Sequence, residues 1–130
     1  MPLPPALVIH GLVHARLALS PGRPVTLLSA PNAAAFAGCG WWRALVGLAL
    51  AEYPGAAAED VLDCGAAPGR ALEALSVGCR LLVLAPCPAF ADIAERATRL
   101  GAAVLPDRPA ALDLAERGAE RRLAAWLSAS

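Results

Sequence analysis

Five short apolar runs, each followed by a turn and a helical stretch, constrain the fold of this chain more than any other feature. The runs are nearly continuous in Val, Leu and Ile: Ala6–Ile9, Val25–Ser29, Val61–Cys64, Arg80–Leu84 and Ala102–Leu105. Continuous apolar strands are buried on both faces, as in a parallel sheet covered by helices. The pattern predicts a three-layer αβα sandwich with a five-stranded, mostly parallel sheet and right-handed crossovers.

Turn residues divide the segments between the runs into helices. We predict helices over about 11–19, 32–52 with a break at 38–40, 68–77, 88–100 and 110–127. Proline opens the third and fourth helices and glycine follows them, which is the usual asymmetry of helix ends. In the last helix one face is apolar at helical spacing: Leu112, Ala115, Ala119, Leu123 and Trp126.

Length and charge place limits on the class of protein. The 130 residues suit one domain, 1–130, and 11 cations balance 11 anions. Nucleic-acid binding draws on an excess of cations, so we expect no nucleic-acid partner. There is no Lys for a Schiff base or a phosphate-loop NTPase. Pro and Gly interrupt the longest uncharged run, 24–42, so we expect no membrane span.

The cysteines and histidines bear on location and metal binding. No export signal accompanies the four Cys residues, so we expect a cytoplasmic protein with reduced thiols. His10 and His14 stand four residues apart, but the Cys residues are scattered and acidic partners at ligand spacing are missing. We therefore expect no metal site, and no residue pattern identifies a cofactor.

The succession of elements resembles the flavodoxin-like class, which includes response-regulator receiver domains, and it is also Rossmann-like. Asp63, at the end of the third run, matches the position of the receivers' phosphoacceptor. Receivers have an acidic pair after the first strand and a Lys after the fifth, where this chain has His10-Gly11 and Asp107-Arg108. The resemblance implies a fold with candidate strand order 2-1-3-4-5, and not phosphotransfer.

Ligands of open α/β sheets bind outside the carboxyl ends of the strands, where the strand order reverses. With the order 2-1-3-4-5, this point lies between the first and third strands. The sequence predicts ligand-binding residues at this edge: His10, Asn32, Asp63, Cys64, Gly65, Gly69 and Arg70. Two Gly residues, a helix start and an Arg favour a small anionic ligand. The alternative is that Gly65 turns the chain and Asp63 binds the turn.

Three functions remain open at this level. The leading interpretation is a non-catalytic domain that binds a ligand or a partner at the carboxyl edge. The second is a small enzyme that uses Cys64, Asp63 and His10 for acyl or thiol chemistry, with the Cys pKa lowered by a helix N-terminus. The third is a structural or regulatory dimeric subunit without a ligand.

The double tryptophan is the most unusual local sequence. Adjacent helix positions point about 100° apart, so Trp41 and Trp42 do not fill one core pocket. The helix that follows is apolar nearly all round and needs cover on more than one side. We predict a symmetric homodimer through this helix, with Trp41, Trp42 and Leu45 at the interface. A ligand stacked on one Trp and a loop folded over the helix are the alternatives.

Overall fold

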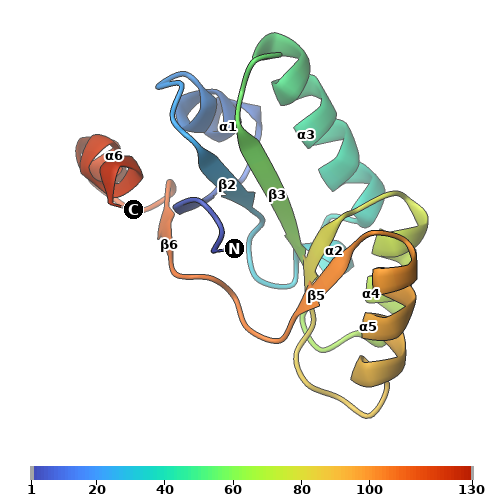
Figure 1. The fold of residues 1–130 in the computed structure, drawn as a ribbon. Coiled ribbons are helices and arrows are strands. Elements are labelled where there is room, and N and C mark those ends of the chain that lie inside the picture. The colour runs from blue at the N-terminus through green and yellow to red at the C-terminus, as the bar shows by residue number, and fades with distance from the viewer. Residues whose placement is uncertain (1, 130) are drawn as a thin grey trace.

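The computed structural model describes residues 2–129, which form a single α/β domain around a six-stranded, all-parallel sheet (Figure 1). The strands are β1 (Ala6–Val8), β2 (Val25–Leu28), β3 (Ala58–Asp63), β4 (Leu81–Val83), β5 (Ala103–Leu105) and β6 (Ala111–Asp113). The helices are α1 (Leu12–Leu19), α2 (Ala33–Phe36), α3 (Cys39–Glu52), α4 (Pro68–Ser76), α5 (Phe90–Arg99) and α6 (Ala119–Ser128). No helix within residues 2–129 is both long and apolar enough to cross a membrane.

The strand order corrects part of the prediction. All five apolar runs form strands of a parallel sheet, as predicted, but the order is β5-β4-β3-β2-β1-β6 rather than 2-1-3-4-5. Each of the first four crossovers places the new strand next to the preceding one, always toward the same edge of the sheet. The order therefore reverses between β1 and β6, where register pairs Val8 with Asp113.

The sixth strand replaces the beginning of the predicted last helix. Ala111–Asp113 pairs with β1, and the helix begins only at Ala119, after a turn that ends at Gly118 in the left-handed region (φ 79°). Leu112 and Leu114 are both buried, which is the alternation of a strand. The prediction was wrong here because the apolar residues from 112 to 126 also fit a helical period. A strand of three residues is too short to be recognised against that pattern.

Each helix of residues 2–129 contributes buried apolar residues to one large core. Strand residues of one face, including Leu7, Leu27, Leu62 and Leu82, belong to this core together with the buried residues of the helices. Right-handed crossovers in one direction keep α1, α3, α4 and α5 on the same side of the sheet, and Figure 1 shows α3, α4 and α5 along that side.

The other face of the sheet is covered by irregular chain. Its smaller apolar cluster, built on Val8, Leu28, Val61 and Val83, packs against Leu3 and contains no helix residue. The N-terminal segment is fastened there because the Thr26 hydroxyl donates to the carbonyl of Pro4 at 2.8 Å. The connection 106–110 returns on this side from β5 to β6 (Figure 1). The fold is therefore consistent with the predicted three-layer, Rossmann-like arrangement. It differs in that the layer on this face of the sheet is formed by irregular chain instead of helices.

Candidate functional site at the carboxyl edge

Asp63 is the centre of a buried polar cluster at the end of β3. One carboxylate oxygen, Oδ1, accepts the backbone N–H of Gly65 at 2.6 Å and that of Asn32 at 3.1 Å. The backbone N–H of Asp63 donates to the hydroxyl of Ser29 at 2.9 Å. The side chain therefore fixes the turn after β3 to the turn after β2.

Arg108 completes this cluster from the β5–β6 connection. Its Nη1 donates to Oδ2 of Asp63 at 2.7 Å and to the carbonyl of Ser29 at 3.1 Å. The Asp63 side chain is 5% exposed and that of Arg108 is 27% exposed. Charge-assisted hydrogen bonds of this length are strong, and a buried carboxylate needs such a partner. Arg108 was not among the predicted site residues, although it is the cation that Asp63 binds.

The residues predicted to bind an anion do not surround an unpaired cationic side chain. Asn32, Asp63 and Gly65 are brought into contact, and a Cβ on Gly65 would lie 2.5 Å from Oδ1 of Asn32. Gly69 is exposed on α4, and Arg70 lies 3.3 Å from Glu73 on the same helix. The turn-binding alternative for Asp63 describes these contacts, and a ligand role for the predicted residues stays a prediction.

Cys64 lacks the surroundings of a nucleophile. Its side chain is fully buried, and burial raises the pKa of its thiol to about 12. Burial likewise raises the pKa of Cys39 to about 12 and that of Cys79 to about 11. A reactive Cys needs a lowered pKa and access to solvent, and Cys64 has neither here. The enzyme alternative based on Cys64 therefore stays a prediction without support from these surroundings.

Thiol titration of the native protein is expected to find one fast thiol per chain. Cys87 is half-buried, whereas the other three Cys residues are buried. A chromogenic disulfide reagent at pH 7 measures this as one rapid equivalent, rising to four after unfolding in urea. Replacing Cys87 with Ser removes the rapid equivalent. A rapid equivalent that persists in C87S and disappears on replacing Cys64 would restore Cys64 as a nucleophile.

A second polar cluster lies where the strand order reverses, between β1 and β6. Nε2 of His10 is 2.7 Å from Oδ1 of Asp113, and the two side chains are 36% and 34% exposed. The backbone N–H of Ala115 also donates to this oxygen, at 2.9 Å. Burial acts to raise the pKa of Asp113, but the bonds from Ala115 and His10 lower it overall. Asp113 was placed in a helix by the sequence pattern and so was missed.

His14 faces His10 from the first turns of α1. Its Nδ1 accepts the backbone N–H of His10 at 3.1 Å, and the two ring centroids are 5.5 Å apart in a T-shaped arrangement. Burial lowers the pKa of His14, with repulsion from His10 adding to the effect. His10 therefore joins His14 and Asp113, not Asp63 and Cys64 as predicted, because β2 separates β1 from β3.

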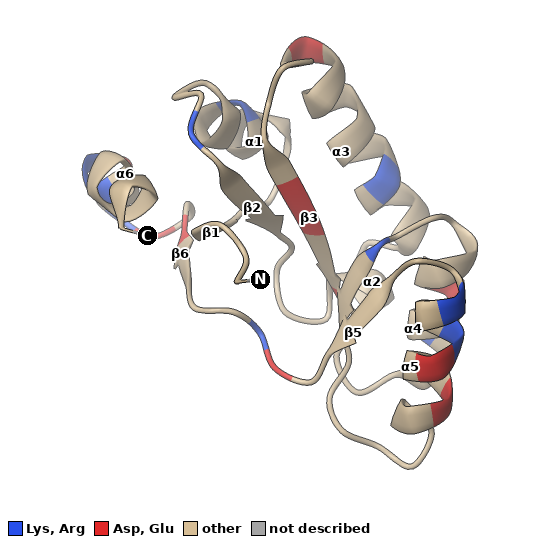
Figure 2. Cartoon of the chain, in the orientation of Figure 1, with Lys and Arg blue, Asp and Glu red and all other residues tan. Residues whose placement is uncertain are grey.

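An uncharged surface begins at this edge and continues along α3. Phe36 on α2 is 69% exposed, and Trp41 and Leu48 on α3 are 38% and 61% exposed. The other exposed positions of α3 before its last residue are small: Gly40, Ala44, Gly47 and Ala51. We call the exposed part of 40–51 the α3 face. On α3 only Arg43 and the last residue, Glu52, are charged, whereas the shorter α5 carries four charged residues of both signs (Figure 2).

Two of the three predicted interface residues lie in the core instead. Trp42 is 0% exposed and Leu45 is 7% exposed, so neither is accessible to a second subunit in this fold. The prediction that the adjacent Trp residues point to different surroundings is confirmed. The indole N–H of Trp42 makes no hydrogen bond of good geometry in residues 2–129. It nevertheless acts to lower the pKa of Asp60, which burial raises overall.

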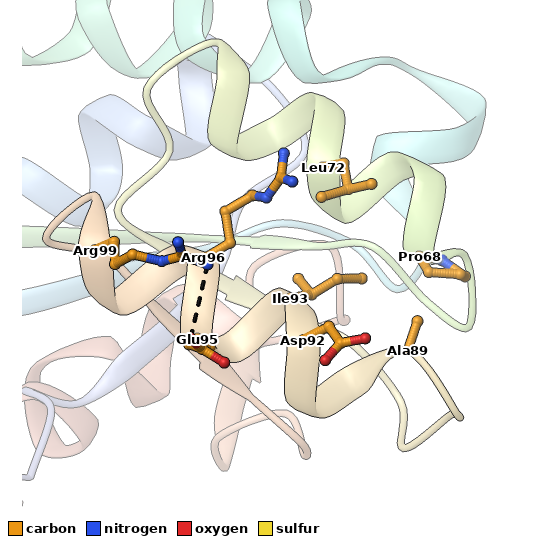
Figure 3. A pocket seen from close by; sticks show the side chains of 8 residues that line it. All are labelled: Pro68, Leu72, Ala89, Asp92, Ile93, Glu95, Arg96 and Arg99. Carbon is orange, nitrogen blue, oxygen red and sulfur yellow. Dashed lines mark ion pairs between the residues drawn. The ribbon is translucent and has the colours of Figure 1, made fainter.

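Two hollows of about 400 Å³ and 420 Å³ lie away from both polar clusters. The first is a groove between α4 and α5, where Leu72 and Ile93 are flanked by Asp92 and Arg96 (Figure 3). The second is lined by the N-terminal prolines and by Leu127 of α6. Neither hollow is lined by a predicted ligand-binding residue.

Comparison with known proteins adds no family. No protein-family model matches the sequence, and no curated protein is significantly similar to it. Within residues 2–129, no group of three or more His, Cys, Asp and Glu residues is arranged to hold a metal ion.

Proposed function

We propose that this protein is a cytoplasmic partner-binding domain that recognises a protein surface through the α3 face, and that its partner is a second copy of the chain. The observation that carries the proposal is the exposure of Trp41 and Leu48 on a helix face with no charged residue. Exposed apolar side chains that cluster on one face are typical of protein interfaces. The cytoplasmic location is proposed because the four Cys residues form no disulfide.

A protein partner is favoured over a small ligand. The Asp63 cluster binds its own turns and Arg108, so its charges are already satisfied within the chain. The α3 face combines two large apolar side chains with small residues that let another helix approach closely. Paired charges lie beside it, with Arg16 bound to Glu52 and Arg43 bound to Asp60. An apolar centre with a polar rim is the usual anatomy of an interface.

A second copy is the partner that this arrangement fits. A two-fold symmetric contact brings the same surface from both chains together. Because the α3 face has no charge, two copies meet without like-charge repulsion at the centre. Small residues beside Trp41 and Leu48 leave room for the large side chains of the other copy. Ala44, midway between Gly40 and Leu48, then lies next to its own counterpart.

The first test is the effect of a charge on the α3 face. Wild-type protein is expected to be a dimer at micromolar concentration by light scattering and sedimentation velocity. Leu48→Arg is expected to weaken the dimer by about 100-fold or more, because an unpaired charge enters the interface twice. The matched control is Leu100→Arg, which should leave the dimer intact. Leu100 is 58% exposed at the end of α5, a helix that packs on α4. A wild-type monomer at 100-fold higher concentration would contradict the proposal.

Cross-linking tests the geometry in a second way. In a Cys87→Ser background, Ala44→Cys is expected to form an intermolecular disulfide on mild oxidation, because Ala44 lies near the two-fold axis. Ala124→Cys, at an exposed position of α6, is the control and should stay reduced under the same conditions. Equal cross-linking of the two variants would indicate random collision and would remove α3 from the interface.

A further inference from the structure

We propose that His10 is a nucleophilic imidazole that accepts acyl groups from activated esters at the β1–β6 edge, with Asp113 as its positioning residue. This goes beyond the proposed dimer and does not depend on it. The proposal uses the cluster that lies where the strand order reverses, which is where ligands bind in open α/β sheets. It rests on the hydrogen bonds of the two imidazoles, which determine which ring nitrogen carries the proton in each neutral side chain.

The contacts of His10 determine which of its nitrogens is free. The carboxylate of Asp113 is acceptor-only when ionised, so Nε2 of His10 carries the proton in their 2.7 Å bond. A neutral His10 then has its lone pair on Nδ1. Among the contacts of the described chain, no hydrogen bond occupies Nδ1. The His10 side chain is 36% exposed, and Nδ1 is the ring nitrogen that its contacts leave free to act as a nucleophile.

His14 has the opposite arrangement. The backbone N–H of His10 donates to Nδ1 of His14, so that nitrogen has no proton. The neutral form of His14 therefore has its proton on Nε2. A metal ion would need lone pairs from both rings, which this tautomer of His14 does not provide. The pair instead combines one nucleophilic nitrogen with one N–H donor, 5.5 Å apart between ring centroids.

This combination suits acyl transfer. Nδ1 of His10 attacks the ester carbonyl carbon, a C–N bond forms, the C–O bond to the leaving group breaks, and the leaving group departs as its anion. Asp113 stabilises the positive acyl-imidazolium through Nε2–H, and His14 Nε2–H is a donor for the departing oxygen. Water then attacks the acyl carbon and the C–N bond breaks. One proton of the water stays on the carboxylic acid and the other passes to the solvent, and the imidazole is released neutral, with its proton still on Nε2.

The experiment measures hydrolysis of p-nitrophenyl acetate by the full chain in the Cys87→Ser background, which removes the accessible thiol. His10→Gln is expected to lower the second-order rate constant at least about tenfold, to the level of the reagent with N-acetylhistidine amide or below. The control is Leu100→Gln, at an exposed position outside the cluster, which is expected to keep the rate. His14→Gln removes the donor to the departing oxygen and is expected to lower the rate by a smaller factor than H10Q. Equal rates for the background protein and H10Q would overturn the proposal.

The role of Asp113 has a readout independent of hydrolysis. Long-range ¹H–¹⁵N spectra are expected to show neutral His10 as the Nε2–H tautomer, and Asp113→Ala is expected to give a mixture of tautomers together with a several-fold lower rate. A rate loss in D113A with the tautomer unchanged would remove Asp113 as the positioning residue. A wild-type His10 with its proton on Nδ1 would overturn the proposal itself.

Discussion

Replacing Asp63 with Ala is expected to lower the free energy of unfolding by about 3–5 kcal/mol. The substitution leaves the part-buried N–H groups of Gly65 and Asn32 without their acceptor and removes the buried carboxylate that Arg108 binds. Whole domains are stable by only about 5–15 kcal/mol, so the loss is about a third or more of the margin of a domain of ordinary stability. Urea unfolding followed by circular dichroism measures the effect.

Two variants separate the contributions of Asp63. Asp63→Asn keeps one oxygen for the two N–H groups but loses the charge opposite Arg108, so its loss should be smaller than that of D63A. Glu73→Ala removes the acidic partner of an exposed pair with Arg70 and is expected to change stability by less than about 1 kcal/mol. Equal stability of D63A and E73A would show that the Asp63 cluster does not hold the two turns.

Trp42→Ala is also expected to destabilise the fold by about 3–5 kcal/mol, because the largest fully buried side chain of the core is removed. The adjacent Trp41→Ala should cost the monomer less than about 1 kcal/mol, since Trp41 is partly exposed. Unfolding at low protein concentration measures both without the contribution of a dimer.

Trp42→Phe distinguishes volume from hydrogen bonding. The indole N–H of Trp42 makes no hydrogen bond of good geometry in residues 2–129, although it acts on the Asp60 carboxyl. Replacing the indole with an apolar ring therefore loses volume and at most a weak polar contact. We expect W42F to recover more than half of the stability lost in W42A. Similar losses in W42A and W41A would contradict the placement of Trp42 in the core.

The sequence predicts the elements of this fold better than their order. Continuous apolar runs locate β1 to β5 because burial on both faces selects Val, Leu and Ile whatever the neighbouring strand is. Strand order depends on which edge each crossover reaches, and that choice leaves no local pattern. The turn at Asp63 and Gly65 is predictable because it depends on a local contact. The carboxylate of Asp63 accepts the backbone N–H of the residue two positions later, Gly65.

The two residues that sequence reasoning missed at the edge are both long-range partners. Arg108 reaches Asp63 because the connection 106–110 crosses the sheet, a path that follows from the position of β6. Asp113 meets His10 because β6 lies beside β1. Recognising the alternation of Leu112 and Leu114 as a strand would have been the signal for both, but helical spacing over the same residues concealed it.

The order of strands has a consequence for how the chain folds while it is being synthesised. Each strand from β2 to β5 pairs with the strand made just before it, so the sheet can grow at one edge as the chain emerges from the ribosome. β6 is the exception, because Ala111 must find Ala6 across nearly the whole chain. Closing so long a loop is slow, and we expect the pairing of β1 with β6, and with it the meeting of His10 and Asp113, to be the last step of folding.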